Sequence, residues 1–146
     1  SKQGRHAEAV GVYRTLLTGL YATDPGLMQG LARAQFESAD AAGAKSTLEA
    51  LIAANPEFKS ADGHLLFARA VEATGDAAKA LDEYRALAEY YPGGEAAVRY
   101  ARLLSQRGRA DDARRVLREL VDRMSLAPPH VRKAQQAWLA EAERGA

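Results

Sequence analysis

The sequence predicts an all-α fold in which antiparallel helix pairs repeat along the chain. Three observations lead to this prediction. The chain is rich in Ala, Leu, Arg and Glu, which are good helix formers. No run alternates apolar and polar residues with period two, so strands are disfavoured. Similar text recurs every 33 to 36 residues, a period typical of helical repeat proteins.

The repeat is carried by apolar residues at helical spacing in the second helix of each unit. The small residues that open this stripe are Ala9, Ala44, Ala80 and Ala113, at spacings of 35, 36 and 33. The large residues four positions later are Tyr13, Leu48, Tyr84 and Leu117. The residues three further on are Leu16, Leu51, Leu87 and Leu120. Positions separated by three and four residues share one helix face, so each series marks a buried stripe.

Local signals place the helices in order. We expect one domain over 1–146 with eight helices: an unpaired second helix at 5–20, helix pairs at 25–56, 59–92 and 94–125, and a capping helix at 129–144. Asp24 followed by Pro25 is the favoured order at a helix start. Ser60 and Asp76 are further expected N-caps. The final segment has apolar residues on one face and charges opposite, which is typical of the cap that closes a repeat array.

Composition excludes several functions. Hydrophobic residues make up 47% and charged residues 27% of the 146-residue protein, as in ordinary globular domains. The absence of cysteine rules out disulfides, thiolate zinc sites and a cysteine nucleophile. His6, His64 and His130 lie in different repeats without acidic residues at ligand spacing. We therefore predict no enzymatic activity, no metal and no cofactor.

The third copy of the repeat carries a family resemblance. Gly75 lies at its turn, Ala80 and Tyr84 in its second helix, and Pro92 at its end. This pattern resembles the tetratricopeptide repeat, a helix-turn-helix unit of about 34 residues. The resemblance covers nearly the whole sequence and implies a right-handed superhelical solenoid of antiparallel helix pairs.

The repeats are divergent. Met28 and His64 stand where the family has a bulky aromatic residue, and Ala39 replaces the turn glycine of the second copy. The divergence is most similar to repeats of bacterial proteins that have no assigned function, some of which carry an N-terminal membrane anchor. We interpret the sequence as a fragment of a longer protein and expect a cytoplasmic location, with a tether in a preceding segment as one alternative. No run of about 20 apolar residues is present.

The resemblance implies that a protein or peptide binds in the concave groove lined by the first helices. An arginine recurs at one groove position of each unit, where helix packing does not require it. The groove residues that we expect to contact a peptide are Arg33, Arg69, Arg102, Arg99, Gln29, Phe36, Leu65, Glu72 and Ser105. Guanidinium groups bind carboxylates in pairs of hydrogen bonds, so an acidic peptide or the C-terminus of a polypeptide suits this stripe.

The same arginines have a purely structural interpretation. Arg33 can pair with Glu37, and Arg69 with Glu72, at spacings of four and three residues. Arg102 has no acid at either following position, so we expect it to be the most available to a ligand.

Charge distribution leaves two further alternatives. Residues 1–98 contain 9 Lys and Arg against 13 Asp and Glu, a net charge of −4, whereas residues 99–146 contain 11 against 6, a net charge of +5. The basic final third could bind RNA or another polyanion, although no interleaved aromatics point to base stacking. The repeats could also be a structural or oligomerising module of a membrane-anchored protein.

The first helix lacks a first-helix partner within its own repeat. Its apolar residues Val10, Tyr13, Leu17 and Leu20 are therefore expected to be partly uncovered. Exposed apolar area favours self-association, so we predict homodimer contacts through this end.

Overall fold

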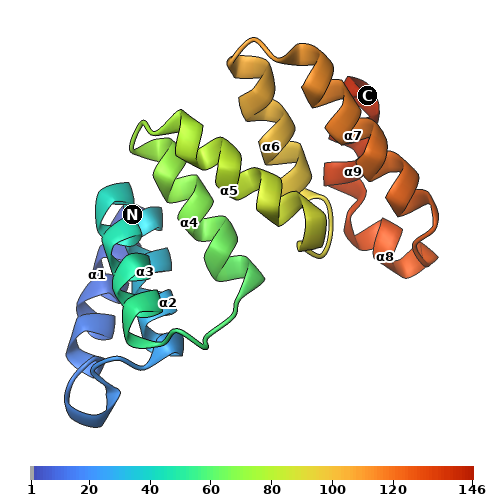
Figure 1. Cartoon of the computed structure of the whole chain (residues 1–146). Helices are drawn as coiled ribbons and strands as arrows, with labels where there is room; N and C mark the ends of the chain where they lie inside the picture. Colours follow the sequence, from blue (N-terminus) through green and yellow to red (C-terminus); the bar gives the residue numbers. More distant parts are fainter. Residues whose placement is uncertain (1) are drawn as a thin grey trace. The chain divides into compact units, whose positions relative to one another are not determined.

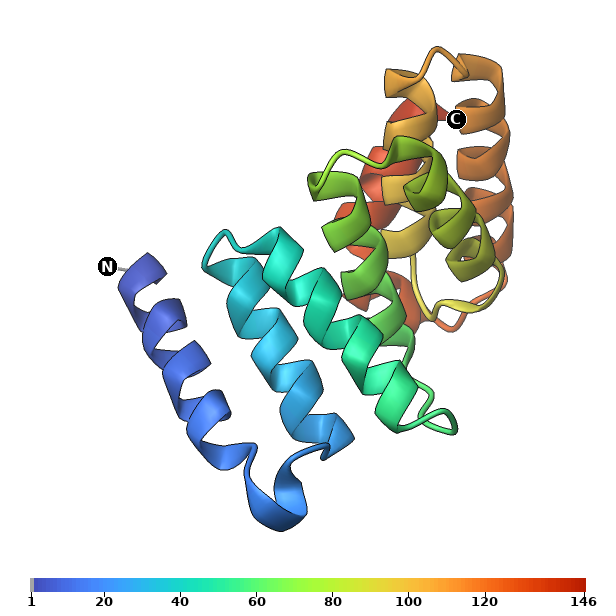
Figure 2. The same ribbon diagram turned by 60° about the vertical axis from the view of Figure 1, so that its left-hand side comes forward.

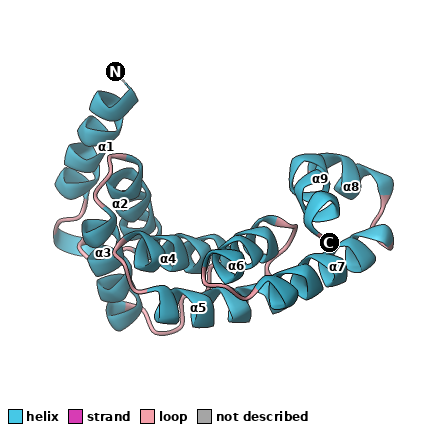
Figure 3. Ribbon diagram, turned by 90° about the horizontal axis from the view of Figure 1, so that it is seen from above, coloured by secondary structure: helices cyan, strands magenta, loops and turns pink. Residues whose placement is uncertain are grey.

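The computed structural model describes residues 2–146, and within this range every regular element is a helix (Figures 1 and 3). The predicted all-α fold is thus confirmed. The protein divides into two compact units. Unit 1 ends at Asp76, and unit 2 runs from Ala77 to Ala146.

Unit 1 contains four α-helices and one short 3-10 helix among its described residues. These are α1 (Lys2–Leu16), η1 (Gly19–Tyr21), α2 (Pro25–Glu37), α3 (Ala41–Ala54) and α4 (Ala61–Ala73). Figure 2 shows α1, α2 and α3 side by side, with neighbours running in opposite directions. α4 packs against α3. Their shared core contains Met28, Ala32, Ala44, Leu48, Leu51, Leu66 and Ala70.

Unit 2 contains five helices, with α6, α7 and α9 sharing one core. The elements are α5 (Ala77–Tyr90), α6 (Glu95–Gln106), α7 (Ala110–Ser125), α8 (Pro129–Ala134) and α9 (Gln136–Gly145). α6 packs against α5 and α7, and α9 packs chiefly against α7. The core includes Ala97, Leu104, Ala113, Leu117, Leu120 and Ala142.

The repeated small residue lies at the tightest packing position. Ala44 and Ala80 are fully buried and Ala113 is 3% exposed. A larger side group there would overpack the helix interface, typically at a cost of about 1–3 kcal/mol. The leucine seven residues later is equally buried in α3, α5 and α7, but its equivalent in α1, Leu16, is 47% exposed. The buried alanine is therefore accompanied by a buried leucine in α3, α5 and α7, but not in α1.

Capping side chains fix where the helices of unit 1 begin. Asp24 Oδ1 accepts a hydrogen bond from the Leu27 N–H at 2.9 Å, and Pro25 is the first helical residue. Ser60 Oγ accepts from the Gly63 N–H at 3.0 Å. Each cap satisfies a donor that the first turn of a helix leaves unpaired.

Two predicted helices differ from the structure. The capping helix is interrupted at Gln135, so α8 and α9 are separate, and Gln135 Oε1 accepts a hydrogen bond from the Gly94 N–H at 2.8 Å. The protein therefore has nine α-helices over the described residues rather than eight. The first helix ends at Leu16 instead of residue 20, and Gly19 then adopts a positive φ of 56°.

The first helices α2, α4 and α6 end in the same way. In α2, the Ala39 N–H donates to the Phe36 carbonyl at 3.0 Å and the Asp40 N–H donates to the Gln35 carbonyl at 2.8 Å. This is a Schellman motif, and it requires a left-handed residue after the cap. Gly75 and Gly108 supply it in α4 and α6, whereas α2 uses Ala39 at φ 69°.

Replacing Ala39 with glycine should therefore stabilise the protein. A non-glycine residue in the left-handed region costs about 1 kcal/mol, so Ala39→Gly is expected to raise the free energy of unfolding by about that amount in urea titrations. The control Ala50→Gly lies on the exposed face of α3 and should lower it by about 1 kcal/mol. Equal destabilisation by both substitutions would contradict the assignment of strain to Ala39.

Candidate protein-binding site

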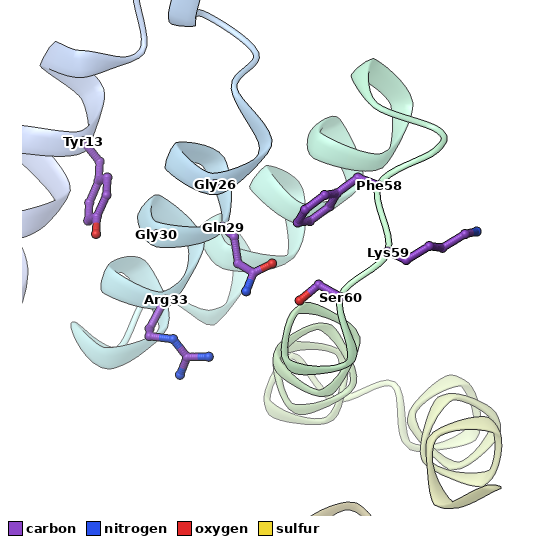
Figure 4. Close-up of a pocket in the computed structure, with 8 residues that line it drawn as sticks. All are labelled: Tyr13, Gly26, Gln29, Gly30, Arg33, Phe58, Lys59 and Ser60. Atoms are coloured by element: carbon purple, nitrogen blue, oxygen red, sulfur yellow. The ribbon is translucent and has the colours of Figure 1, made fainter. Parts of the chain in front are cut away.

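Unit 1 contains a pocket of about 450 Å³ between α1, α2 and the segment that leads into α4 (Figure 4). Tyr13 comes from α1, whereas Gly26, Gln29, Gly30 and Arg33 come from α2. The remaining lining residues are Phe58, Lys59 and Ser60. A pocket of this size accommodates one or two side chains of a bound segment.

Two glycines on α2 shape the pocket in different ways. Gly26 and Gly30 are four residues apart and therefore lie on one helix face. A Cβ atom on Gly30 would clash with Tyr13 Cε1, so only glycine lets this ring rest against the α2 backbone. A Cβ atom on Gly26 would meet only Asp24 Oδ1, at 3.4 Å. The space beside Gly26 is thus available to a ligand.

The pocket combines aromatic and polar walls. Figure 4 shows the Phe58 ring directed toward Gln29, while the Lys59 amine points away. Gln29 Oε1 is buried, and no described residue donates a hydrogen bond to it. A Cβ atom on Gly63 would lie 2.8 Å from this oxygen, so it faces the start of α4. An unsatisfied buried acceptor costs about 1–3 kcal/mol.

Arg33 lines this pocket and is only weakly paired. Its Nη1 lies 4.0 Å from Glu37 Oε1, and its side chain is 46% exposed. Glu37 Oε2 also lies 3.1 Å from His6 Nδ1 of α1. An exposed pair at this distance contributes at most about 1 kcal/mol, so a ligand carboxylate can compete for Arg33.

Arg69 of α4 reaches back to α2. Its guanidinium carbon lies 4.8 Å from the centroid of the Phe36 ring. A cation over an aromatic face is attracted by about 0.5–1 kcal/mol at a partly exposed site. Two predicted groove residues are therefore brought together, and this contact holds the Arg69 guanidinium beside α2.

In unit 2, the structure corrects the prediction that Arg102 is available. Its Nε donates to Glu141 Oε2 of α9 at 2.6 Å, and its Nη2 donates to Glu141 Oε1. The guanidinium carbons of Arg99 and Arg102 each lie 5.5 Å from the Trp138 ring centroid. The acid that pairs with Arg102 comes from a helix 39 residues further along the sequence, so local spacing could not reveal it.

The pairing changes the chemistry of Glu141. The hydrogen bond from Arg102 holds the pKa of the Glu141 carboxyl below its usual range, against a smaller opposing effect of burial. Arg99 is itself paired with Glu95, four residues earlier on α6, at 2.8 Å. Both predicted groove arginines of unit 2 are thus engaged within the unit.

The other predicted residues are scattered. Leu65 is buried and offers a ligand little surface, Glu72 is half-buried on α4, and Ser105 is exposed on α6. Of the residues predicted for self-association, Val10, Tyr13 and Leu17 are half-buried and Leu20 is 98% exposed. On α1 the more exposed apolar side groups are Val12 and Leu16, and self-association through this end remains a prediction.

The basic residues of α7 are partly neutralised. Asp112 accepts hydrogen bonds from Arg109 Nε at 2.9 Å and from Arg115 Nη2 at 2.8 Å, which hold the pKa of its carboxyl below the usual range. Arg114 pairs with Asp111. Over the described part of the protein, the structure contains no cluster of three potential metal ligands. Within the same range, no helix has the length and apolarity needed to cross a bilayer.

Comparison with known proteins agrees with this architecture. Residues 28–57, which span α2 and α3, match the tetratricopeptide repeat family model. Several solved structures match nearly the whole chain. The chain has the tetratricopeptide-repeat fold. The recognition of this repeat from sequence is confirmed.

The individual similarities are at low sequence identity. The TPR-like repeats of a Podosopora anserina protein described as a putative kinesin light chain match with a TM-score of 0.73 and 20% identity, over 97% of this chain and 79% of that chain. PcrH in complex with the chaperone-binding region of PopB matches with a TM-score of 0.71 and 19% identity, over 88% and 98%. MamA matches with a TM-score of 0.71 and 13% identity, over 97% and 85%. No curated protein sequence matches significantly.

Only part of this pocket was predicted from the sequence. The predicted groove residues include Gln29 and Arg33, but not Gly26, Gly30 or the segment of Phe58, Lys59 and Ser60. The spacing of Gly26 and Gly30 on one face of α2 was a usable signal for a hollow. The contribution of residues 58–60 depends on how the α3–α4 connection folds back, which the periodicity does not specify.

The glycine assignment can be tested with a matched pair of substitutions. Alanine at Gly30 must displace the Tyr13 ring, whereas alanine at Gly26 meets no close neighbour. Both changes add helix propensity, so their difference reports the clash. We expect Gly30→Ala to be less stable to urea than Gly26→Ala by about 1 kcal/mol. Equal stability of the two variants would show that Tyr13 does not pack against α2.

The Arg102–Glu141 contact predicts a pH-dependent stability. A carboxyl whose folded pKa is lowered stabilises the protein above its unfolded pKa, about 4.3, and loses this contribution as the pH falls through the folded value. Glu141→Gln should therefore be less stable than the wild type at pH 7, by up to about 1 kcal/mol, and the gap should narrow as the pH falls below the unfolded pKa and close below the lowered folded pKa. Urea titrations at pH 7 and at a series of acidic pH values measure it. Glu143→Gln, on the same helix, is the control, and a gap that persists at low pH would contradict the ion pair.

Proposed function

We propose that this protein is a non-catalytic scaffold that binds a segment of another protein on unit 1. The observation that carries the proposal is the pocket between α1, α2 and residues 58–60, with Arg33 in its wall. An apolar side chain of the segment would enter the pocket, and an acidic side chain next to it in the segment would pair with Arg33. The partner is therefore an acidic segment with an apolar anchor.

The pocket has the features of an anchoring site. Tyr13 and Phe58 supply aromatic walls, and the bare backbone at Gly26 leaves room for an entering side group. Anchors of this kind contribute most of the binding energy at protein interfaces, because they are fully desolvated on binding. The Gln29 side-chain N–H would donate a hydrogen bond that orients the segment.

Charge favours an acidic segment. Arg33 is half exposed, and Arg69 of α4 lies over Phe36 of α2. At 4.0 Å, the Glu37 carboxylate is too far from the Arg33 guanidinium for a hydrogen bond. A ligand carboxylate at hydrogen-bonding distance would make a shorter, charge-assisted contact.

The structural comparisons support a protein partner. PcrH, which shares this fold, is described in complex with the chaperone-binding region of PopB. The alternative of RNA binding gains less support, since Arg109, Arg114 and Arg115 are paired with Asp111 and Asp112. An oligomerising role through α1 would be compatible with binding on unit 1.

Selection from a displayed random-peptide library tests the proposal. Peptides enriched on the wild-type protein should combine acidic residues with a large apolar residue. Their affinity, measured by fluorescence anisotropy, should fall at least tenfold on Arg33→Glu, which corresponds to about 1.4 kcal/mol. Gly26→Leu, which fills the pocket without a backbone clash, should have a similar effect.

Arg85→Glu provides the matched control. Arg85 is 70% exposed on α5 and lies 4.0 Å from Asp82, so its charge reversal changes the net charge equally outside the pocket. It should leave affinity within about twofold. If Arg33→Glu and Gly26→Leu bind the selected peptides as the wild type does, or if no peptide is enriched, the proposal is wrong.

A further inference from the structure

Unit 2 contains a cluster in which two arginines of one helix contact a tryptophan and a glutamate of another helix, much as they would contact the side chains of a bound ligand. Glu141 of α9 accepts two hydrogen bonds from the Arg102 guanidinium, and Trp138 lies 5.5 Å from the guanidinium carbons of both Arg99 and Arg102. Arg99 and Arg102 are three residues apart on α6, and Trp138 and Glu141 are three residues apart on α9. Each pair lies on one helix face, so two helices meet through complementary side chains.

The rest of α8 and α9 is held by little buried surface. Ala142 is the buried residue of α9, and no residue of α8 is buried. Trp138 and Leu139 pack against the core without being fully buried. The side chains of Arg102 and Glu141 are 44% and 30% exposed. Elements with few buried apolar contacts open locally at a small fraction of the global free energy of unfolding.

The connections on both sides of α8 are short and irregular. Leu126, in the link from α7, is 88% exposed, and the next helix begins at Pro129 after Pro128. At Gln135 the helix is interrupted, and the Gln135 side chain accepts a hydrogen bond from the Gly94 N–H at 2.8 Å. Besides these polar contacts and the Arg–Trp–Glu cluster, α8 and α9 pack on the core of unit 2 through Val131, Trp138, Leu139 and Ala142.

We propose that Arg99 and Arg102 form a binding site for a helical protein segment, and that α9 occupies this site in cis. The segment carries an aromatic residue and a glutamate three positions later, as Trp138 and Glu141 do. A partner with this pattern competes with α9 for the two arginines. Access to the site therefore depends on how often α9 opens, and the Trp138 and Glu141 contacts set that frequency.

This partner differs from a generic anion. A phosphate group would satisfy Arg102 but would not reproduce the aromatic ring held against both guanidinium groups. The spacing of three residues fits a helix, where both side chains project from one face. A helical protein segment matches the charge, the ring and the geometry together.

The test uses the 146-residue protein and a labelled synthetic peptide of its own residues 129–146 as the probe. In the protein, Trp138→Ala combined with Glu141→Gln weakens the occupant in cis. We expect this variant to bind the peptide roughly tenfold more tightly than the wild type does, a change that corresponds to about 1.4 kcal/mol. Adding Arg102→Glu should abolish binding, whereas adding Arg85→Glu should not. A peptide with the same two substitutions should not bind.

Hydrogen exchange of the α9 backbone amides reports whether α9 has opened, so that each result of the binding measurement can be interpreted. The double variant should exchange faster over residues 136–145 while α6 and α7 stay protected. If α9 opens and the peptide still does not bind, the site does not recognise this chemistry. If α9 stays protected, the cluster does not hold it, and the inference fails as well. Displacement of the peptide by poly(U) RNA, with binding insensitive to Trp138, would identify a polyanion site instead.

A single substitution guards against misfolding of the double variant. Glu141→Gln retains Trp138, the one tryptophan of the sequence, so its emission reports whether the ring leaves the two guanidinium groups. This variant should show an intermediate gain in peptide affinity, and adding peptide should shift its emission. Unchanged affinity together with an unchanged spectrum would overturn the proposal.

Discussion

The close approach of helices at one small residue per repeat is the constraint on which the structure depends. Ala44, Ala80 and Ala113 are almost completely inaccessible to solvent, and a leucine seven residues later is buried beside each of them. A single helix pair cannot cover its own apolar face, so each pair is stable only when its neighbours cover it. Because of this requirement, the apolar residues of every second helix pack against neighbouring helices. Binding of a partner is therefore expected at the polar residues of the first helices.

The arginines at these polar positions have different contacts in the two units. In unit 1, Arg33 lies 4.0 Å from the Glu37 carboxylate and lines a pocket in which Gly26 leaves open space. In unit 2, Arg102 donates two hydrogen bonds to Glu141 and lies against Trp138. Equivalent arginines of the repeat are therefore unequal: Arg33 has a weak ion pair beside a pocket, whereas Arg102 has a close carboxylate partner within its unit.

The helices were predictable because periodic apolar residues and local caps are encoded in short segments. Asp24, Ser60 and the turn at Gly75 act as their local sequence predicts. The errors arise where distant residues decide. The last helix is interrupted at Gln135, whose side chain accepts a hydrogen bond from Gly94, and Glu141 reaches Arg102 across 39 residues. Part of the pocket could likewise not be predicted from the sequence. Phe58 and Ser60 line it because the α3–α4 connection folds beside α2, and no helical periodicity specifies that conformation.

Docking of an acidic segment in the unit 1 pocket beside Arg33 can be tested by nuclear magnetic resonance of the isotopically labelled protein, titrated with a peptide selected for binding. If the segment docks there, we expect the largest shifts at the Arg33 Nε–H and the Gln29 side-chain amide, together with the Gly26 and Ser60 backbone amides. Largest shifts on the outer faces of α3 or α7, with these signals unchanged, would contradict it.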